Sequence, residues 1–276
     1  MTTTPSSEII SSASNPEIKK LRALHERKFR RQTGLFLAEG MRIITEACQL
    51  GHPPQRLVIT ENRDKEPGMK PLIAACRDAG GRVMMVTEKL MMRISNKDNP
   101  QTVLGAFNQF SHPLNTEDGN SPAKDDSSPE TGVWVALDRV RDPGNLGTIM
   151  RTADAAGARG IILIDDCTDP FSTEACRASM GAIFNMKIFH TSTDGFTRFA
   201  TGWPGQIIGT ALHASVDFRR ANWSRPLILL MGNEQQGLTD RLAETATQLV
   251  RLEMHGRSDS LNLAVTTGIC LYEALR

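Results

Sequence analysis

The sequence lacks several features that mark large classes of proteins. Its longest apolar run, Leu227–Met231, is far too short to span a bilayer, so we expect no membrane-spanning segment. The start, MTTTPSSEII, has neither the basic and apolar regions of a secretory signal nor the Arg-rich character of a transit peptide. The five cysteines are scattered, with no C-x-x-C pair, which indicates reduced thiols and a cytoplasmic protein.

Motifs for several common cofactors and nucleophiles are also missing. No G-x-G-x-x-G follows a strand-like run and no G-x-x-x-x-G-K-[ST] occurs, so dinucleotide-binding and P-loop functions lose their main support. No G-x-S-x-G elbow is present. The six His and five Cys have no metal-ligand spacing, so we expect no metal site.

The formal net charge of +1 hides an asymmetry along the chain. Residues 1–110 carry 17 Lys and Arg against 11 Asp and Glu, whereas residues 111–131 carry 1 against 5. Such clustering fits either a polyanionic partner or a solvated helix face. The cations are densest in PEIKKLRALHERKFRRQ, which contains Lys19, Lys20, Arg22, Arg27, Lys28, Arg30 and Arg31.

Changes in composition predict two domains joined by a linker. Residues 111–131 are rich in Pro, Ser, Asp and Gly and have almost nothing to bury, which is typical of a flexible acidic linker. Residues 1–110 alternate helical stretches with the strand-like runs LFLAEG, RLVIT, RVMMVT and TVLGAF. This alternation predicts a small α/β domain.

The region after the linker, residues 132–276, has stronger strand signals. Its runs GVWVALDRV, GIILID, MKIFHT, QIIGTAL, PLILLMG and QLVRLEM are almost continuously apolar, as parallel strands covered on both faces are. Helical stretches begin near Asn145, Ser172, Glu234 and Ser260. The pattern predicts a doubly wound parallel sheet, whose ligands lie beyond the carboxyl ends of the strands.

Three loops after these strands combine Gly with polar residues: LDRVRDPGNLG, LLMGNEQQGLTD and LEMHGRSDSLN. Each residue has an ordinary structural explanation when taken alone. Asn145 can cap a helix, Arg151 can make a surface ion pair, and Glu234 at a helix start suits the helix dipole. The recurrence of such loops at three strand ends has no such explanation and favours a shared ligand site.

The start of the last helix leaves two interpretations open. Asp259 or Ser260 can cap the helix by accepting hydrogen bonds from its first N–H groups. Alternatively, Ser260 and Asn262 stand at a helix start that faces a ligand, because unsatisfied donors there suit anions and polar atoms.

The segments DPGNLGTIMRTADAAG, GNEQQGL and RLEMHGRSDSLNLAVTTGICLYEAL closely resemble the three signature motifs of the SpoU (TrmH-type) branch of the SPOUT RNA methyltransferases. The resemblance implies methyl transfer from S-adenosyl-L-methionine to a ribose 2′-hydroxyl. It also implies a parallel α/β sheet with a C-terminal trefoil knot, and a homodimer whose active site borrows residues across the interface. The region before the linker resembles the L30e-like substrate-binding domain of rRNA-directed members.

Matching positions in these motifs imply the site residues. The polar catalytic positions are Asn145, Arg151, Glu234, Ser260 and Asn262. The positions that contact the cofactor are Thr210, Ala211, Gly232, Leu252, Met254 and Leu261. We expect the seven clustered cations of the first domain to contact RNA phosphates. One departure is Glu253, which stands where the family usually has Pro and leaves that loop less constrained.

The resemblance leaves the proton acceptor and the substrate open. Family precedent points to Arg151, yet a guanidinium is effectively always protonated. We therefore expect Arg151 to stabilise the developing alkoxide, with a substrate phosphate oxygen or a transiently neutral Arg as the base. The expected substrate is 23S rRNA, with guanosine as one candidate for the methylated nucleoside; the sequence does not name the base. The alternatives are a tRNA 2′-O-methyltransferase and a non-catalytic RNA-binding paralogue.

Overall fold

The computed structural model describes residues 9–114, 132–214 and 216–276. Its strands form where the sequence concentrates Val, Ile and Leu. The chain divides into two units. Unit 1 comprises Met1–Gln109 and Phe171–Phe184, and unit 2 comprises Phe110–Pro170 and Asn185–Arg276. Within the described ranges, every helix is too short or too polar to span a lipid bilayer.

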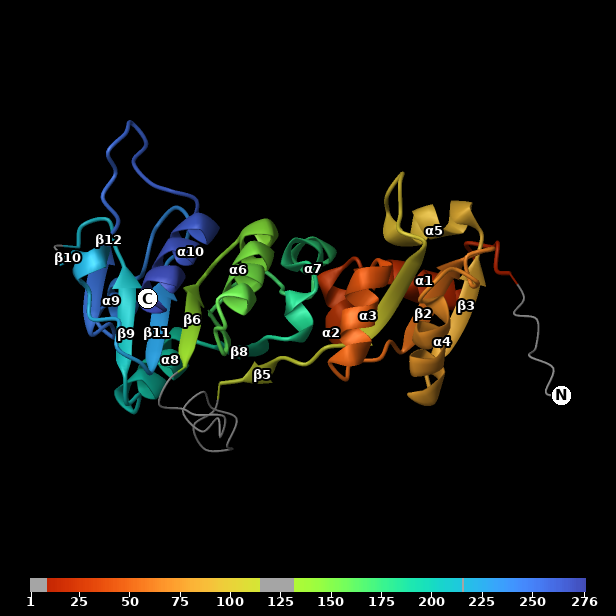
Figure 1. Ribbon diagram of the computed structural model, residues 1–276, viewed down its shortest axis with the longest axis horizontal. Coiled ribbons are helices and arrows are strands. Elements are labelled where there is room, and N and C mark those ends of the chain that lie inside the picture. Colours follow the sequence, from red (N-terminus) through yellow and green to blue (C-terminus); the bar gives the residue numbers. More distant parts are fainter. Residues whose placement is uncertain (1–8, 115–131, 215) are drawn as a thin grey trace. The chain divides into compact units, whose positions relative to one another are not determined.

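Unit 1 is built on a mixed sheet with the strand order β1–β4–β2–β3. Its paired strands β2 and β3 are labelled in Figure 1. Strand β4 is antiparallel to β1 and β2, and β2 is parallel to β3. The elements are α1 Pro16–Ala23, α2 Arg27–Thr33, β1 Leu35–Glu39, α3 Met41–Gln49, β2 Arg56–Thr60, α4 Met69–Asp78, β3 Arg82–Val86, α5 Glu88–Ser95, β4 Val103–Asn108, α7 Thr173–Ser179 and the 3₁₀ helix η3 Ala182–Phe184. The four strands predicted before the linker are confirmed.

Alternation along these strands places apolar side chains on both faces of the unit 1 sheet. Leu37 and Val58 belong to a buried cluster with residues of α1 and α5. On the other face, Phe107 packs its ring 4.9 Å from that of Phe184, and Phe36 lies 5.7 Å from the same ring. Residues 171–184 thus pack on this sheet, although they follow the linker in the chain. The predicted domain boundaries stay a prediction.

Unit 2 contains a parallel sheet with the strand order β10–β12–β9–β11–β6–β7–β8–β5. Its elements are β5 His112–Pro113, β6 Val133–Asp138, α6 Pro143–Ala155, β7 Gly160–Ile164, β8 Lys187–Thr191, α8 Thr193–Thr201, β9 Gln206–Thr210, β10 Val216–Asp217, the 3₁₀ helix η4 Phe218–Arg220, β11 Leu227–Met231, α9 Asp240–Ala243, β12 Gln248–Arg251 and α10 Leu263–Ala274. All six strands predicted after the linker are confirmed.

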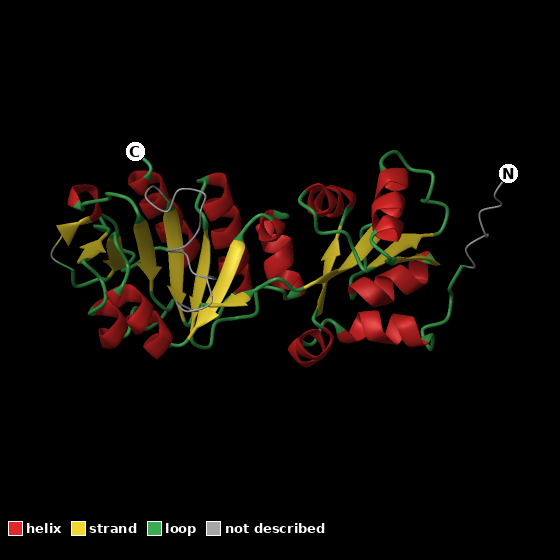
Figure 2. Cartoon of the chain, turned by 90° about the horizontal axis from the view of Figure 1, so that it is seen from below, coloured by secondary structure: helices red, strands yellow, loops and turns green. Residues whose placement is uncertain are grey.

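Helices cover both faces of the unit 2 sheet (Figure 2). Phe196 and Phe199 of α8 and Leu242 of α9 are buried with Ile162 and Ile228 of the sheet. Helices α6 and α10 contact each other and strands β7 and β11, respectively. The predicted α/β fold with a doubly wound parallel sheet is confirmed. The knot stays a prediction.

The first residues of the predicted linker belong to the sheet. His112 and Pro113 form β5 and pair with β8, so these two residues of the predicted linker lie in a strand. Residues 115–131, which make up the rest of the predicted linker, lie outside the described residues.

The predicted caps of two helices are corrected. Helix α6 begins at Pro143, and Asp142 caps it instead of Asn145, because Asp142 Oδ1 accepts the N–H of Asn145 at 2.6 Å. Helix α10 begins only at Leu263, so Asp259 and Ser260 lie too far upstream to cap it. Its cap is Asn262.

One of the seven cations expected to contact RNA is buried and has a structural role. The Arg30 side chain is only 3% exposed, and its Nη1 donates to the carbonyl oxygens of Leu24 and His25, both at 2.8 Å. These carbonyls lie at the end of α1, where helical partners are missing. The prediction that Arg30 contacts RNA is therefore wrong: its side chain binds the carbonyl groups at the end of α1. The other six cations are exposed.

We predict that Arg30→Ala lowers the free energy of unfolding by about 1.5–3 kcal/mol, because one buried and one partly buried carbonyl lose a charged donor. The matched control is Arg31→Ala, which removes an exposed neighbour and should change stability by less than about 0.5 kcal/mol. Urea unfolding followed by circular dichroism measures both. Equal stability of the two variants would contradict the structural role of Arg30.

Candidate functional site

The carboxyl ends of four neighbouring strands lie level in unit 2. Thr210 of β9 pairs with Val250 of β12, Gly209 pairs with Leu230 of β11, and Met231 pairs with Leu137 of β6. Because the strands are parallel, the loops that follow them leave the sheet at one edge. Four predicted cofactor positions lie at or just beyond this edge: Thr210, Ala211, Gly232 and Leu252.

Gly232 allows the chain to turn back tightly after β11. A Cβ atom at this position would lie 2.2 Å from the carbonyl carbon of Gly237 and from the nitrogen of Leu238, so any larger residue would clash with backbone. Asn233 and Gly237 exchange backbone hydrogen bonds of 3.0 and 2.9 Å that close the turn. Gly232 is thus required because the backbone of residues 237 and 238 passes directly against it.

A chain of hydrogen bonds joins the three motif loops. Glu234 Oε1 accepts a hydrogen bond from Nδ2 of Asn145 at 3.2 Å. Oδ1 of Asn145 accepts from Nδ2 of Asn262 at 2.9 Å. Oδ1 of Asn262 accepts from the N–H groups of Ala264 and Val265 at 2.9 and 3.3 Å. Three of the five predicted catalytic residues therefore meet.

The ends of this chain set the orientation of both amides. An ionised carboxylate only accepts hydrogen bonds, and a backbone N–H only donates them. Asn145 must therefore turn its NH₂ group towards Glu234, and Asn262 must turn its oxygen towards the start of α10. Asn262 therefore caps α10, in place of Asp259 or Ser260, and the same side chain takes part in the hydrogen-bond chain between the motif loops.

The predicted helix at Glu234 is wrong. Glu234 lies in the turn of residues 233–237, and the next helix, α9, begins at Asp240. Its carboxylate instead accepts the N–H groups of Arg141 and Asp142 at 3.3 and 3.4 Å, just before α6. A carboxylate does stand at a helix start, where the dipole favours it, but the helix belongs to another motif.

The two other predicted catalytic residues lie outside this chain. Arg151 is exposed on α6, about 120° around the helix from Asn145. Within the described parts of the chain, its guanidinium has no hydrogen bond or ion pair, and neither has the hydroxyl of the exposed Ser260. Both groups are free to contact a ligand. The loop before Ser260 carries Met254, which is half-buried, and Leu261 follows it, 41% exposed.

A polar cluster that was not predicted from the sequence supports the Glu234 turn. Asp138 is fully buried, and its two carboxylate oxygens accept from Nε and Nη2 of Arg139 at 2.8 and 3.1 Å. Asp138 also accepts the N–H of Thr239, and Nδ2 of Asn233 donates to the carbonyl of Arg139. The hydrogen bond to Asp138 raises the pKa of Arg139. An available signal was the single carboxylate ending the apolar run VWVALD.

Comparisons with known proteins cover nearly the whole chain. The model of the SpoU rRNA Methylase family matches residues 132–272, and the model of the MRM3-like substrate binding domain matches residues 15–105. A solved AdoMet-bound rRNA methyltransferase from Sinorhizobium meliloti is 44% identical, with a TM-score of 0.87 and 97% of both chains covered.

Two curated relatives carry specific names. A 23S rRNA guanosine 2′-O-methyltransferase of Bacillus subtilis is 27% identical over 95% of this chain and 97% of its own. A 23S rRNA uridine 2′-O-methyltransferase of Streptomyces viridochromogenes is 29% identical over 92% of this chain and 86% of its own.

Two thiols near the motif loops are buried and unsuited to nucleophilic chemistry. Burial raises the pKa of Cys167 to about 11 and that of Cys270 to about 12, so both stay protonated at neutral pH. The Sγ of Cys167 donates to the carbonyls of Leu137 and Ile164. In the described ranges, no group of three or more His, Cys, Asp or Glu side chains is arranged to hold a metal ion.

These shifts predict loss of stability at alkaline pH. Unfolded thiols lose their protons around pH 9, whereas Cys270 keeps its proton in the folded protein up to about pH 12. Unfolding therefore releases a proton in this window, and the free energy of unfolding falls as the pH rises above about 9. Urea unfolding at pH 8 and 10 should show a smaller fall for Cys270→Ala than for the wild type. An equal fall in both proteins would contradict the raised pKa.

Proposed function

The chain belongs to the SpoU rRNA methylase family, and from this premise we propose that it transfers a methyl group from S-adenosylmethionine to a ribose 2′-hydroxyl of 23S rRNA. The observation that carries the proposal is the hydrogen-bond chain from Glu234 through Asn145 to Asn262. It joins the family's three motifs at the edge of the sheet where ligands of parallel α/β proteins bind.

The residues at this edge fit the cofactor. When bound, S-adenosylmethionine supplies the methyl group. Leu212, just after β9, is 66% exposed, and Leu261 is 41% exposed, so apolar side chains stand uncovered next to polar main chain. That combination suits a ligand with an apolar ring and polar substituents. The residues that would hold it are Thr210, Ala211, Gly232, Leu252, Met254 and Leu261.

The main chain of Ala211 can contribute only one group. Its N–H donates to the carbonyl of Val250 at 2.9 Å, and its carbonyl oxygen accepts the N–H of Ala214 at 3.2 Å, so one lone pair of that oxygen remains for a ligand. Thr210 keeps a hydroxyl at the same strand end, where it contacts Sδ of Met231 at 3.7 Å.

The polar residues divide the work of aligning the ribose and stabilising charge. Asn145 and Asn262 are held in one orientation by Glu234, so they orient the ribose with little reorganisation. The free hydroxyl of Ser260 contacts the sugar. Alignment of donor and acceptor can supply about 7–11 kcal/mol of the barrier. Arg151 stabilises the developing alkoxide, and a phosphate oxygen of the substrate or a transiently neutral Arg accepts the proton.

The exposed cations of α1 and α2 support an RNA substrate. Six of the seven cations remain exposed: Lys19, Lys20, Arg22, Arg27, Lys28 and Arg31. They provide phosphate contacts on one short stretch of chain, which position RNA without reading its sequence. Relatives that act on guanosine and on uridine share this chemistry, because the reacting atom belongs to the sugar.

An apolar stripe on α10 supports a homodimer. Val265, Ile269 and Tyr272 are 51%, 37% and 58% exposed and lie at helical spacing on one face. Together with Thr148 and Thr152 of α6 they line a hollow. A second copy seated on this stripe would cover it. Arg151 neighbours Thr152 in α6, so we infer that it acts on substrate held by the partner subunit.

We predict that Arg151→Lys lowers kcat about 100-fold, because it keeps the charge but loses the planar fork that holds the alkoxide and phosphate. The matched control is Arg198→Lys, an exposed arginine of α8, with unchanged kcat. The assay follows methyl transfer from labelled S-adenosylmethionine to unmodified 23S rRNA. Calorimetry checks that both variants still bind the cofactor.

The same assay separates the alternatives. Mapping of 2′-O-methyl groups names the nucleotide, and a product found only in tRNA would replace the rRNA substrate. Wild-type protein that binds RNA but neither binds S-adenosylmethionine nor transfers a methyl group would be a non-catalytic paralogue. Near-normal turnover of Arg151→Lys would contradict the role given to the guanidinium.

We predict that Tyr272→Glu converts a dimer into a monomer, because it replaces the most exposed apolar side chain of the stripe with a charged one. The control is Met92→Glu, which charges an apolar side chain of α5 in unit 1 that is 39% exposed and is not part of the stripe. Size-exclusion chromatography with light scattering should give twice the chain mass for the wild type and the control. A dimeric Tyr272→Glu variant would contradict this interface.

A further inference from the structure

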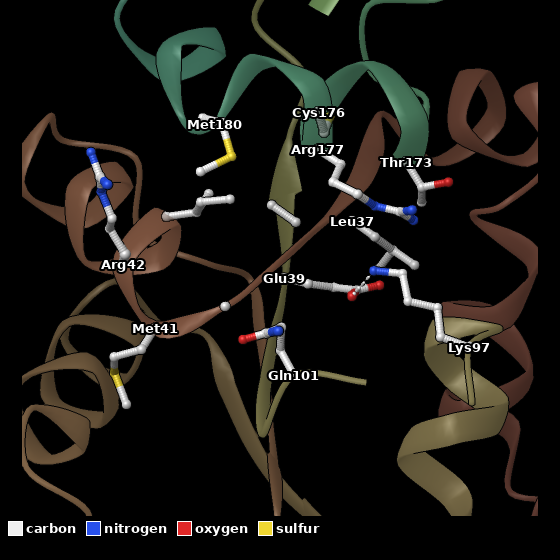
Figure 3. Close-up of a pocket in the computed structure, with 13 residues that line it drawn as sticks. Leu37, Glu39, Met41, Arg42, Lys97, Gln101, Thr173, Cys176, Arg177 and Met180 are labelled. Atoms are coloured by element: carbon white, nitrogen blue, oxygen red, sulfur yellow. Dashed lines mark hydrogen bonds and ion pairs between the residues drawn. The ribbon is translucent and has the colours of Figure 1, made fainter. Parts of the chain in front are cut away.

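A pocket of about 370 Å³ lies in unit 1, and its lining includes no residue of the three motif loops (Figure 3). Its lining comes from the end of β1, the start of α3, the segment around Lys97 and Gln101, and α7. The volume lies within the range of about 300–1,000 Å³ that is typical of pockets for small organic groups. The functions proposed above for the three motif loops and for the cations of α1 and α2 assign no ligand to this pocket.

The polar lining of the pocket is predominantly cationic. Arg42 of α3 and Arg177 of α7 are exposed and have no hydrogen bond or ion pair among the described residues. Lys97 is paired with Glu39, which is only 10% exposed. The pocket therefore has two unpaired guanidinium groups, an internally compensated ion pair and the amide of Gln101.

Apolar side chains line the other part of the pocket. Leu37 and Cys176 are buried at the pocket, and Met180 of the same α7 segment is 41% exposed. Figure 3 shows Met180 and Arg177 descending from the α7 segment over the end of β1, with the Lys97–Glu39 pair opposite them. A flat apolar group inserted here would meet methionine and guanidinium surfaces, and its polar edge would meet the amide and the ion pair.

We propose that this pocket binds one unpaired nucleotide of the RNA substrate. Its base occupies the apolar part, and Arg42 and Arg177 hold the adjoining phosphates. Single-stranded bases are recognised by stacking on guanidinium planes and by hydrogen bonds to their edges, and both kinds of group are present. The proposal rests on the proposed function for the identity of the substrate.

The two arginines come from different parts of the chain, which makes the proposal specific. Arg42 lies in the region that matches the substrate-binding domain, and Arg177 lies in the region that matches the methylase family. The ring contacts of Phe171 and Phe184 with Phe36 hold the α7 segment on unit 1. RNA contact by this pocket therefore requires both regions.

The test compares Arg42→Glu, Arg177→Glu and the double variant with Arg93→Glu. Arg93 is an exposed arginine of α5 in the same unit, so the control makes the same charge change outside the pocket. Fluorescence anisotropy measures the Kd for unmodified 23S rRNA fragments at fixed ionic strength. We expect each pocket variant to raise the Kd about tenfold or more, and the double variant to raise it by less than the product.

Cofactor affinity and turnover are measured on the same proteins. The pocket variants should keep the wild-type Kd for S-adenosylmethionine and the wild-type kcat at saturating RNA. If the proposed function is wrong, the wild-type protein itself will show no methyl transfer, which distinguishes that failure from a failure of the pocket proposal. In RNA substituted with 4-thiouridine, crosslinks should map to peptides that contain residues 37–43 or 173–180.

Two results would overturn the proposal. The first is a change in RNA Kd for the pocket variants that is no larger than that of Arg93→Glu. The second is tight binding of a free nucleoside monophosphate in the pocket without competition against the RNA fragments, which would assign the pocket to a small metabolite. Thermal melting of every variant confirms that the proteins compared are folded.

Discussion

A directional chain of hydrogen bonds is the constraint on which the candidate site depends. Glu234 at one end only accepts, and the first N–H groups of α10 at the other end only donate. A flip of the Asn145 amide would therefore lose two hydrogen bonds, and a flip of the Asn262 amide would lose three. Three loops that would otherwise move separately are thereby held in one arrangement. Such preorganisation is what an enzyme needs in order to orient a sugar hydroxyl without reorganising first.

That chain depends in turn on the parallel register of the unit 2 sheet. Because Thr210, Met231 and Leu137 are level, the loops after their strands begin at the same height and at the same edge. Gly232 then lets the turn fold back within contact distance, and the buried Asp138 anchors its far end through Thr239. The apolar sheet thus positions the polar loops, because the polar side chains that form hydrogen bonds stand at and beyond the ends of its strands.

The cationic residues of unit 1 show that a charge cluster in a sequence is not one functional object. The Arg30 side chain donates hydrogen bonds to two carbonyls at the end of α1, whereas its neighbour Arg31 is exposed. Conversely, Arg42 and Arg177 belong to no charge cluster in the sequence, yet folding brings them to one pocket. Local charge density therefore predicted the general character of the surface but misassigned one member and missed the pair.

Residue patterns alone were sufficient for the strands, the doubly wound parallel sheet, the family and the three loops that hold the site, because these follow from local periodicity and from motifs within short segments. Folding alone settled which polar groups pair. Asn145 meets Glu234 across 89 positions and Asn262 across 117, so no local pattern contains these bonds. The caps of α6 and α10, the turn at Glu234 and the burial of Arg30 belong to the same class. Each depends on where other elements pack, and capping propensity was too weak to predict it.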